Sequence, residues 1–189
     1  MRRYKMKVSD VIKNCFFKLG YGVSTDPSDA ENLSSQESEL VNVLLRAVEN
    51  VHSEIVSTYF PNIVKENVVL VDGKLLFSEL THKKIVYPVS LKRGAETKKI
   101  KVYPAYIESD FSGDAVFEFC ALPDVYAPDT ELGDRVPEWL LSEGVVAEYA
   151  YANNLIDAGA QSEKKFREGL SRLKSHEFCG RYVKPRRWE

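Results

Sequence analysis

The spacing of apolar residues changes twice along this chain of 189 residues, and those changes limit the folds available to it. In residues 9–20 and 34–59 the apolar residues recur every three or four positions, as on one face of an α-helix, and residues 21–32 between them are predicted to form a loop. Over residues 66–121 they come in short runs separated by turn residues, which is typical of β-strands. The helical spacing returns over residues 137–178. The sequence therefore predicts an α+β fold in which a small antiparallel sheet is inserted between helices.

Two helices are predicted before the strands. Ser9 is predicted to be the N-cap of the first helix, Asp10 suits the positive end of its dipole, and Gly20 suits its end. Ser34, followed three residues later by Glu37, forms a capping box that begins a second and longer helix. An amphipathic stripe runs along this helix and consists of Leu40, Leu44, Val48, Val51, Ile55 and Tyr59.

The strand region begins with a predicted β-hairpin. Residues 68–71 and 75–77 are apolar and flank Asp72-Gly73, which supplies the positive φ angles of a type I′ turn. Pro88 and Pro104 cannot donate to a ladder, so both positions predict strand ends or edges. Further strands are predicted at residues 85–87, 100–103 and 115–120. These strands make a small sheet or partial barrel whose edges are available to a neighbouring subunit.

A helical hairpin is predicted after the strands. Pro137 is acceptable in a first helical turn. A glycine inside a helix lowers the stability of that helix by about 1 kcal/mol relative to alanine. Because Gly144 lies inside the predicted helix, we expect that close packing against another helix requires it. Gly159 is predicted to end this helix, and a second arm carries Phe166 and Leu170. The expected organisation is a bundle of about four helices formed by residues 1–64 and 122–180, an inserted β domain at 65–121 and an extended tail at 181–189.

Composition places the chain among soluble globular proteins. The net charge is −2, which gives no overall attraction to nucleic acid or to an anionic membrane. Charge is unevenly distributed, because residues 1–7 are basic and residues 108–138 are mostly acidic, as suits complementary contacts between subunits. No apolar run reaches the roughly 20 residues of a membrane span. We expect a protein that is soluble and made in the cytoplasm.

No catalytic, cofactor-binding or metal-binding constellation is predicted. The three cysteines are far apart and form no metal or redox spacing, and Cys15 and Cys120 have apolar neighbours typical of small core residues. His52 lies on the long helix without a second ligand at a suitable spacing. An acidic stretch, with Asp129, Glu131 and Asp134, lacks the glycine and terminal glutamate of a calcium loop. The sequence predicts that the protein is not an enzyme and binds no cofactor.

The C-terminal tail is the segment most suited to binding a partner. It interleaves cationic and aromatic side chains, the residue types enriched at binding hot spots. Pro185 discourages a helix, so the peptide is expected to be extended. The residues predicted to dock on a partner are Arg181, Tyr182, Lys184, Arg186, Arg187 and Trp188.

This order of parts resembles the head-to-tail connector (adaptor) family of tailed bacteriophages. The resemblance covers nearly the whole chain and rests on pattern and order. It consists of the opening helix at 8–19, the helix ending at Tyr59-Phe-Pro61, the hairpin at 69–78, the segment Ile85-Val-Tyr-Pro-Val89, the acidic approach from Pro123 to Pro137, the helix containing Gly144-Val-Val-Ala-Glu-Tyr149, and the Arg-Arg-Trp ending.

The resemblance implies a structural protein of the virion neck. Members of the family form a ring, typically of twelve subunits, beneath the portal protein, and join the DNA-filled head to the tail. The implied partners are the portal, neighbouring copies in the ring and a downstream tail or neck protein, while genomic DNA passes through the lumen without specific binding. Two alternatives remain, a tail-completion or tail-terminator protein and a small enzyme without a recognisable site.

Overall fold

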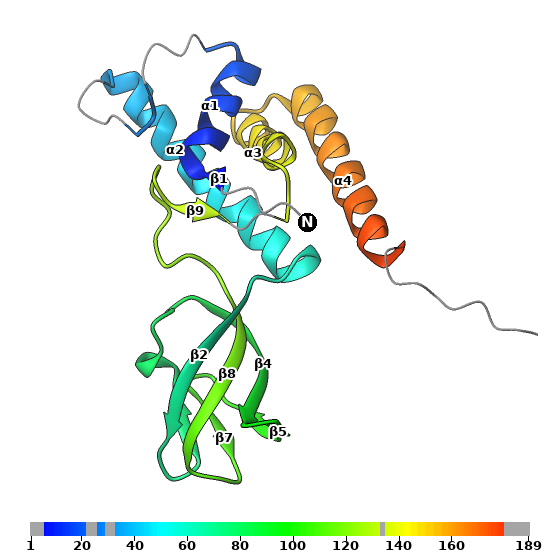
Figure 1. Cartoon of the computed structure of the whole chain (residues 1–189). Coiled ribbons are helices and arrows are strands. Elements are labelled where there is room, and N and C mark those ends of the chain that lie inside the picture. Colours follow the sequence, from blue (N-terminus) through cyan, green and yellow to red (C-terminus); the bar gives the residue numbers. More distant parts are fainter. Residues whose placement is uncertain (1–5, 22–25, 29–32, 133–134, 180–189) are drawn as a thin grey trace, which may run out of the picture. The chain divides into compact units, whose positions relative to one another are not determined.

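The computed structural model describes residues 6–21, 26–28, 33–132 and 135–179, with the side chains of residues 176–179 excepted. Helices and antiparallel strands both occur, so the α+β class predicted from the sequence is confirmed at that level. The chain divides into two compact units. A helical unit contains Met1–His52 and Ala127–Glu189, and a β unit contains Ser53–Tyr126 (Figure 1).

Helix α1 (Val8–Leu19) opens the helical unit and covers the expected residues 8–19. Ser9 is not its N-cap but is buried inside the helix, because Lys7 takes the N-cap position and its backbone N–H donates to the Asp10 carboxylate (3.1 Å). Strand β1 (Met6–Lys7) pairs with β9 (Glu131–Leu132), which fixes this start. Gly20 ends the helix with φ at 77°, as predicted.

Helix α2 (Ser35–Glu54) begins at the predicted capping box. The Ser34 backbone N–H donates to Glu37 Oε2 (2.9 Å), and the Glu37 N–H donates to Ser34 Oγ (3.3 Å). The last turn of the predicted helix is a π-helical segment, η1 (Ile55–Tyr59). Most of the predicted stripe is buried, namely Leu44, Val48, Val51 and Ile55.

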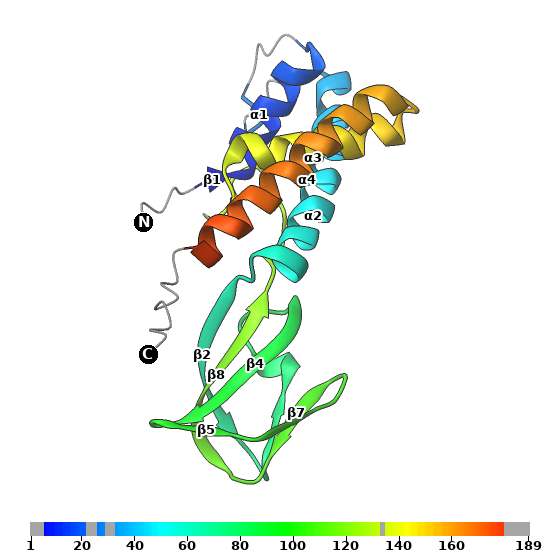
Figure 2. The same cartoon turned by 90° about the vertical axis from the view of Figure 1, so that its right-hand side faces the viewer.

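Helices α3 (Glu138–Ala152) and α4 (Ile156–Cys179) form the predicted hairpin and lie side by side in both views (Figures 1 and 2). Pro137 is the N-cap of α3. The prediction that Gly159 ends this helix is wrong, because the turn lies at Asn153 and Asn154 and Gly159 belongs to the first turn of α4. A Cβ at Gly159 would lie 2.8 Å from the Tyr151 ring, so close packing explains this glycine.

Gly144 allows the close helix packing predicted from the sequence. A Cβ at this position would lie 2.7 Å from Val51 Cγ1 on α2 and 3.0 Å from Phe166 Cε2 on α4. The Asn14 amide donates to the Glu138 carboxylate, and Lys18 Nζ lies 2.9 Å from Glu143 Oε1, which ties α1 to α3.

The β unit contains two antiparallel sheets. The first has the order β2-β8-β4-β5 and the second the order β3-β7-β6. Their strands are β2 (Ile63–Leu70), β3 (Lys74–Leu76), β4 (Ile85–Arg93), β5 (Glu96–Lys98), β6 (Ile100–Val102), β7 (Tyr106–Ser109) and β8 (Gly113–Ala121). A 3₁₀ turn, η2 (Phe77–Glu79), follows β3.

The hairpin between β2 and β3 turns at Asp72-Gly73, with φ at 49° and 74° as predicted. Pro104 follows β6, as expected for a strand end. Pro88 instead lies inside β4, at an irregularity of the β4–β8 ladder, where a missing N–H is tolerated. The short strands β5 and β7 were not predicted.

A hydrophobic core fills the β unit. Phe117 and Phe119 of β8 are fully buried, and their rings stack with centroids 5.0 Å apart. Both sheets contribute side chains to this core, which also contains Val68, Leu70, Leu75, Leu80, Leu91, Ile107, Ala115 and Ala121.

Candidate functional site

The predicted docking residues of the tail lie outside the described part of the chain. They are Arg181, Tyr182, Lys184, Arg186, Arg187 and Trp188. Their docking role stays a prediction.

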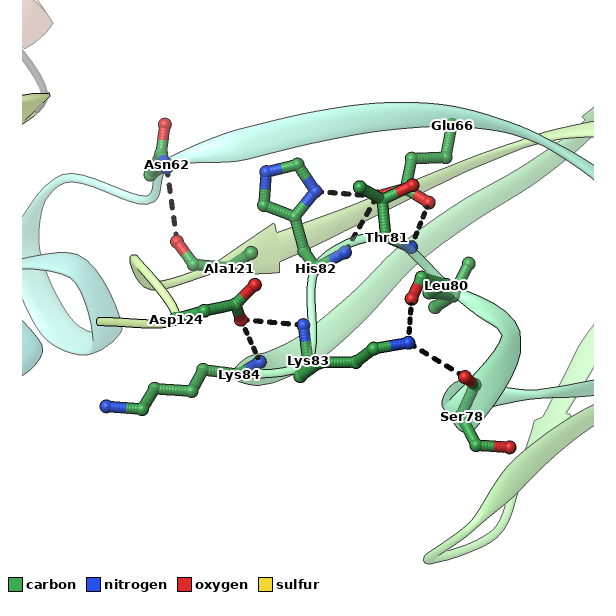
Figure 3. Close-up of polar contacts among 10 residues, drawn as sticks. All are labelled: Asn62, Glu66, Ser78, Leu80, Thr81, His82, Lys83, Lys84, Ala121 and Asp124. Atoms are coloured by element: carbon green, nitrogen blue, oxygen red, sulfur yellow. Dashed lines mark hydrogen bonds and ion pairs between the residues drawn. The ribbon is translucent and has the colours of Figure 1, made fainter.

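The most extensive polar cluster holds the segment Thr81–Lys84, which leads into β4. Glu66 of β2 accepts the backbone N–H of Thr81 (2.9 Å) and of His82 (3.2 Å). Asp124, which follows β8, accepts the N–H of Lys83 (2.7 Å) and of Lys84 (3.1 Å). Two carboxylates therefore hold four successive backbone amides, as Figure 3 shows. We call this arrangement the carboxylate clamp.

Side chains of the segment reinforce the clamp. His82 Nδ1 lies 2.6 Å from Glu66 Oε1, and the His82 and Phe119 rings pack in a T-shaped arrangement with centroids 6.2 Å apart. Lys83 Nζ donates to the Ser78 carbonyl (2.8 Å) and to the Leu80 carbonyl (Figure 3). Leu80 is buried in the core, so the clamp also fixes the backbone of a core residue.

The electrostatics of the clamp favour ionised carboxylates. Burial raises the pKa of Glu66, but hydrogen bonds from His82 and from the Thr81 and His82 amides outweigh it, and the net pKa is lowered. The Lys83 and Lys84 amides lower the pKa of Asp124. Among the described residues, His82 is hydrogen-bonded to Glu66 and to no serine, threonine or cysteine side chain. Its carboxylate–histidine pair therefore serves to hold the segment.

A second polar cluster links three strands of the first sheet. The Glu118 carboxylate of β8 lies 2.8 Å from Lys65 Nζ of β2 and 2.8 Å from Lys92 Nζ of β4. It also accepts a hydrogen bond from the Ser90 hydroxyl (2.7 Å). Lys65, then Lys92 and Ser90, lower the pKa of Glu118 to about 2. A carboxylate matched by three donors from its own sheet stabilises that sheet by linking β2, β4 and β8.

The described cysteines are core residues, as predicted. Burial raises the pKa of Cys15 to about 12, and burial also raises the pKa of Cys120. Both thiols therefore remain protonated at neutral pH. The side chain of Cys179 lies outside the described residues.

The acidic stretch before α3 forms no metal cluster in the part that the structure describes. Asp129 Oδ1 lies 3.2 Å from Lys7 Nζ, beside the β1–β9 pair. Part of the basic N-terminal segment thus pairs with the acidic stretch inside one chain. Asp134 lies outside the described residues. None of the described helices is both long and apolar enough to cross a membrane.

No protein-family model matches the sequence, and no curated protein matches it either.

Sequence reasoning missed the carboxylate clamp and an exposed patch on the second sheet. The clamp joins residues that are 16 and 41 positions apart, and no local pattern indicates such pairings. The patch involves Leu76, Tyr103 and Tyr106, and the alternation of apolar and charged residues in their short strands is the signal that could have revealed it.

Proposed function

We propose that this chain is a structural protein of a bacteriophage virion, a head-to-tail connector that forms a ring beneath the portal. The order of the structural elements supports this proposal. The elements follow one another as in the resemblance: α1 and α2, the seven strands of the β unit, the α3–α4 hairpin and a basic aromatic tail. The protein is then located in the neck between head and tail, acts without catalysis, and is made in the host cytoplasm.

The proposed architecture is a bundle of the four helices with the β unit inserted between α2 and α3. Contacts of α1 with α3, of α3 with α4, and of Val51 with Gly144 support the bundle. The insertion is supported by the division of the chain, since the helical unit is built from two separated stretches.

The proposed partners are the portal protein, identical neighbours and a downstream tail or neck protein. A ring of twelve copies requires a heterologous interface that closes by rotation. Genomic DNA passes through the lumen without specific binding, consistent with the net charge of −2. Sub-micromolar, salt-sensitive DNA affinity of the isolated protein would argue for a nucleic-acid enzyme instead.

The proposed portal contact is the tail, with Trp188 as the buried anchor and Arg186 and Arg187 paired with portal carboxylates. Ordering a peptide costs entropy, but a ring of copies makes each later contact effectively intramolecular, so weak individual contacts suffice.

Deletion of residues 180–189 tests this contact. The truncated protein should keep its circular dichroism spectrum and melting temperature, because the apolar stripe of the second helical arm ends in the sequence at Leu173 or Phe178. It should fail to attach to DNA-filled heads, while a full-length Lys164→Ala, Lys165→Ala control on α4 should attach normally. Normal joining of heads to tails by the truncated protein, or loss of its fold, would refute tail docking.

A further inference from the structure

The turn between β2 and β3 contains the one Asp-Gly bond of the sequence, Asp72-Gly73, and the sequence has no Asn-Gly bond. Because glycine has no side chain, its backbone nitrogen can approach the carboxyl group of a preceding aspartate closely. Asp72 is exposed, so water reaches its carboxyl group. This bond is therefore the position at which the main chain rearranges most easily.

The rearrangement has two steps and requires only water. A bond forms between Gly73 N and Asp72 Cγ, and the amide proton and the carboxyl hydroxyl leave together as water, which gives a succinimide ring. One water molecule then opens the ring at either carbonyl. Opening at Asp72 Cγ restores aspartate, whereas opening at the Asp72 main-chain carbonyl gives isoaspartate. The main chain of isoaspartate passes through the side-chain carboxyl carbon and is longer by one methylene group.

The structure holds the attacking nitrogen away from this reaction. The Gly73 N–H donates to Ser112 Oγ (2.9 Å), and the Gly73 carbonyl accepts the Ser109 N–H (2.8 Å). Gly73 is buried, and a Cβ at this position would lie 2.6 Å from the Ser109 carbonyl oxygen. Ring closure requires Gly73 N to give up its proton and to bond to Asp72 Cγ, so the hydrogen bond to Ser112 must break first.

Isoaspartate does not fit the hairpin that this turn forms. Val71 and Lys74 exchange two backbone hydrogen bonds across the two-residue turn (3.0 and 2.9 Å). Leu70 and Leu75, on either side of the turn, are each 2% exposed. Because a two-residue turn fixes the pairing of its strands, an added methylene group displaces Leu75 from its position in the core.

We propose that Asp72-Gly73 is a site of spontaneous isoaspartate formation, and that the Ser112 hydroxyl preserves the aspartate while the turn is closed. Opening of the turn releases Gly73 N and permits the reaction, so isoaspartate accumulates in molecules whose turn has opened. Ser112 is a positioning residue, since it acts through Gly73 N and takes no part in the bond changes. This site does not depend on the connector proposal.

The test is incubation of the full-length chain at neutral pH. Isoaspartate is measured by labelling with an isoaspartyl methyltransferase and is located by mass spectrometry of peptides. The folded Ser112→Ala chain should form isoaspartate at Asp72 roughly fivefold faster than the unmodified chain, the factor expected for the loss of one hydrogen bond. Ser112→Thr, which keeps the hydroxyl, and Ser171→Ala, at an exposed position of α4, should react like the unmodified chain.

Unfolding in urea and a change at Asp72 complete the test. In urea all of these chains should react at one rate, faster than the folded unmodified chain, because the turn is absent. Asp72→Glu should remove the signal, since the larger ring closes far more slowly. Equal rates for the folded unmodified and Ser112→Ala chains, equal rates for the unmodified chain with and without urea, or isoaspartate at another residue would overturn the proposal.

Hydrogen exchange separates opening of the turn from loss of the fold. In Ser112→Ala the Gly73 amide should exchange faster, while the Phe117 amide, in the central strand β8, should keep its protection. Loss of protection at both amides would mean that the substitution opens the whole β unit, and the specific role of Ser112 would be wrong.

Discussion

At the scale of single residues, His52 makes stability depend on pH. Burial on α2 lowers its pKa from 6.5 to about 4, so between these values the unfolded chain binds the proton and the folded chain does not. The free energy of unfolding should therefore fall as pH drops from about 6.5 to 4, by on the order of 3 kcal/mol. Urea unfolding at several pH values measures this, and His52→Gln should flatten that slope. An equal pH dependence of the free energy of unfolding in both proteins would contradict the role of His52.

Protonation of Glu66 should cause a second loss of stability, at a lower pH than the loss caused by His52. Because its folded pKa is lowered, its contribution is present at neutral pH and is lost as pH falls through that folded value. Glu66→Ala leaves the Thr81 and His82 amides without their acceptor and should cost about 1–3 kcal/mol. Hydrogen exchange of these two amides should accelerate more than that of the Leu70 amide, and uniform acceleration would argue against a local clamp.

At the scale of elements, Gly144 sets the spacing of three helices. Gly144→Ala places a methyl group against Val51 and Phe166, whose branched and aromatic side chains have little freedom to move. The expected loss is about 1–3 kcal/mol, despite the better helix propensity of alanine. Val51→Ala should be less harmful in the Gly144→Ala background than alone, and thermal unfolding of the four proteins measures that coupling. Simple additivity would show that the two residues do not compete for space.

Elements specified by local chemistry were predicted well, and those that depend on distant partners were not. The Ser34–Glu37 box and the Asp72-Gly73 turn need only neighbours in sequence, and both are present as predicted. The N-cap of α1 is Lys7 and not Ser9, because the preceding strand β1 pairs with β9, more than a hundred residues away. Strand β5 contains no apolar residue, and β7 has only two before its polar end, so neither shows a clear strand pattern. The carboxylate clamp and the exposed patch of Leu76, Tyr103 and Tyr106 form only when strands distant in sequence pair with one another.

At the scale of the whole molecule, the β unit should fold without the helices. Its core draws on both sheets and lies within Ser53–Tyr126. A fragment of these residues should show dispersed amide resonances and cooperative unfolding, with lower stability than in the whole chain because small domains bury a smaller fraction of their surface. A fragment without protected amides would mean that the two units are not independent.

We propose a connector ring of this chain between portal and tail. The most direct measurement is an electron cryomicroscopy map of the virion neck with this chain identified by its fold. We expect a closed ring of heterologously packed copies directly beneath the portal, with residues 181–189 in contact with portal subunits. A neck without this chain, or a chain present only as an isologous dimer, would contradict it.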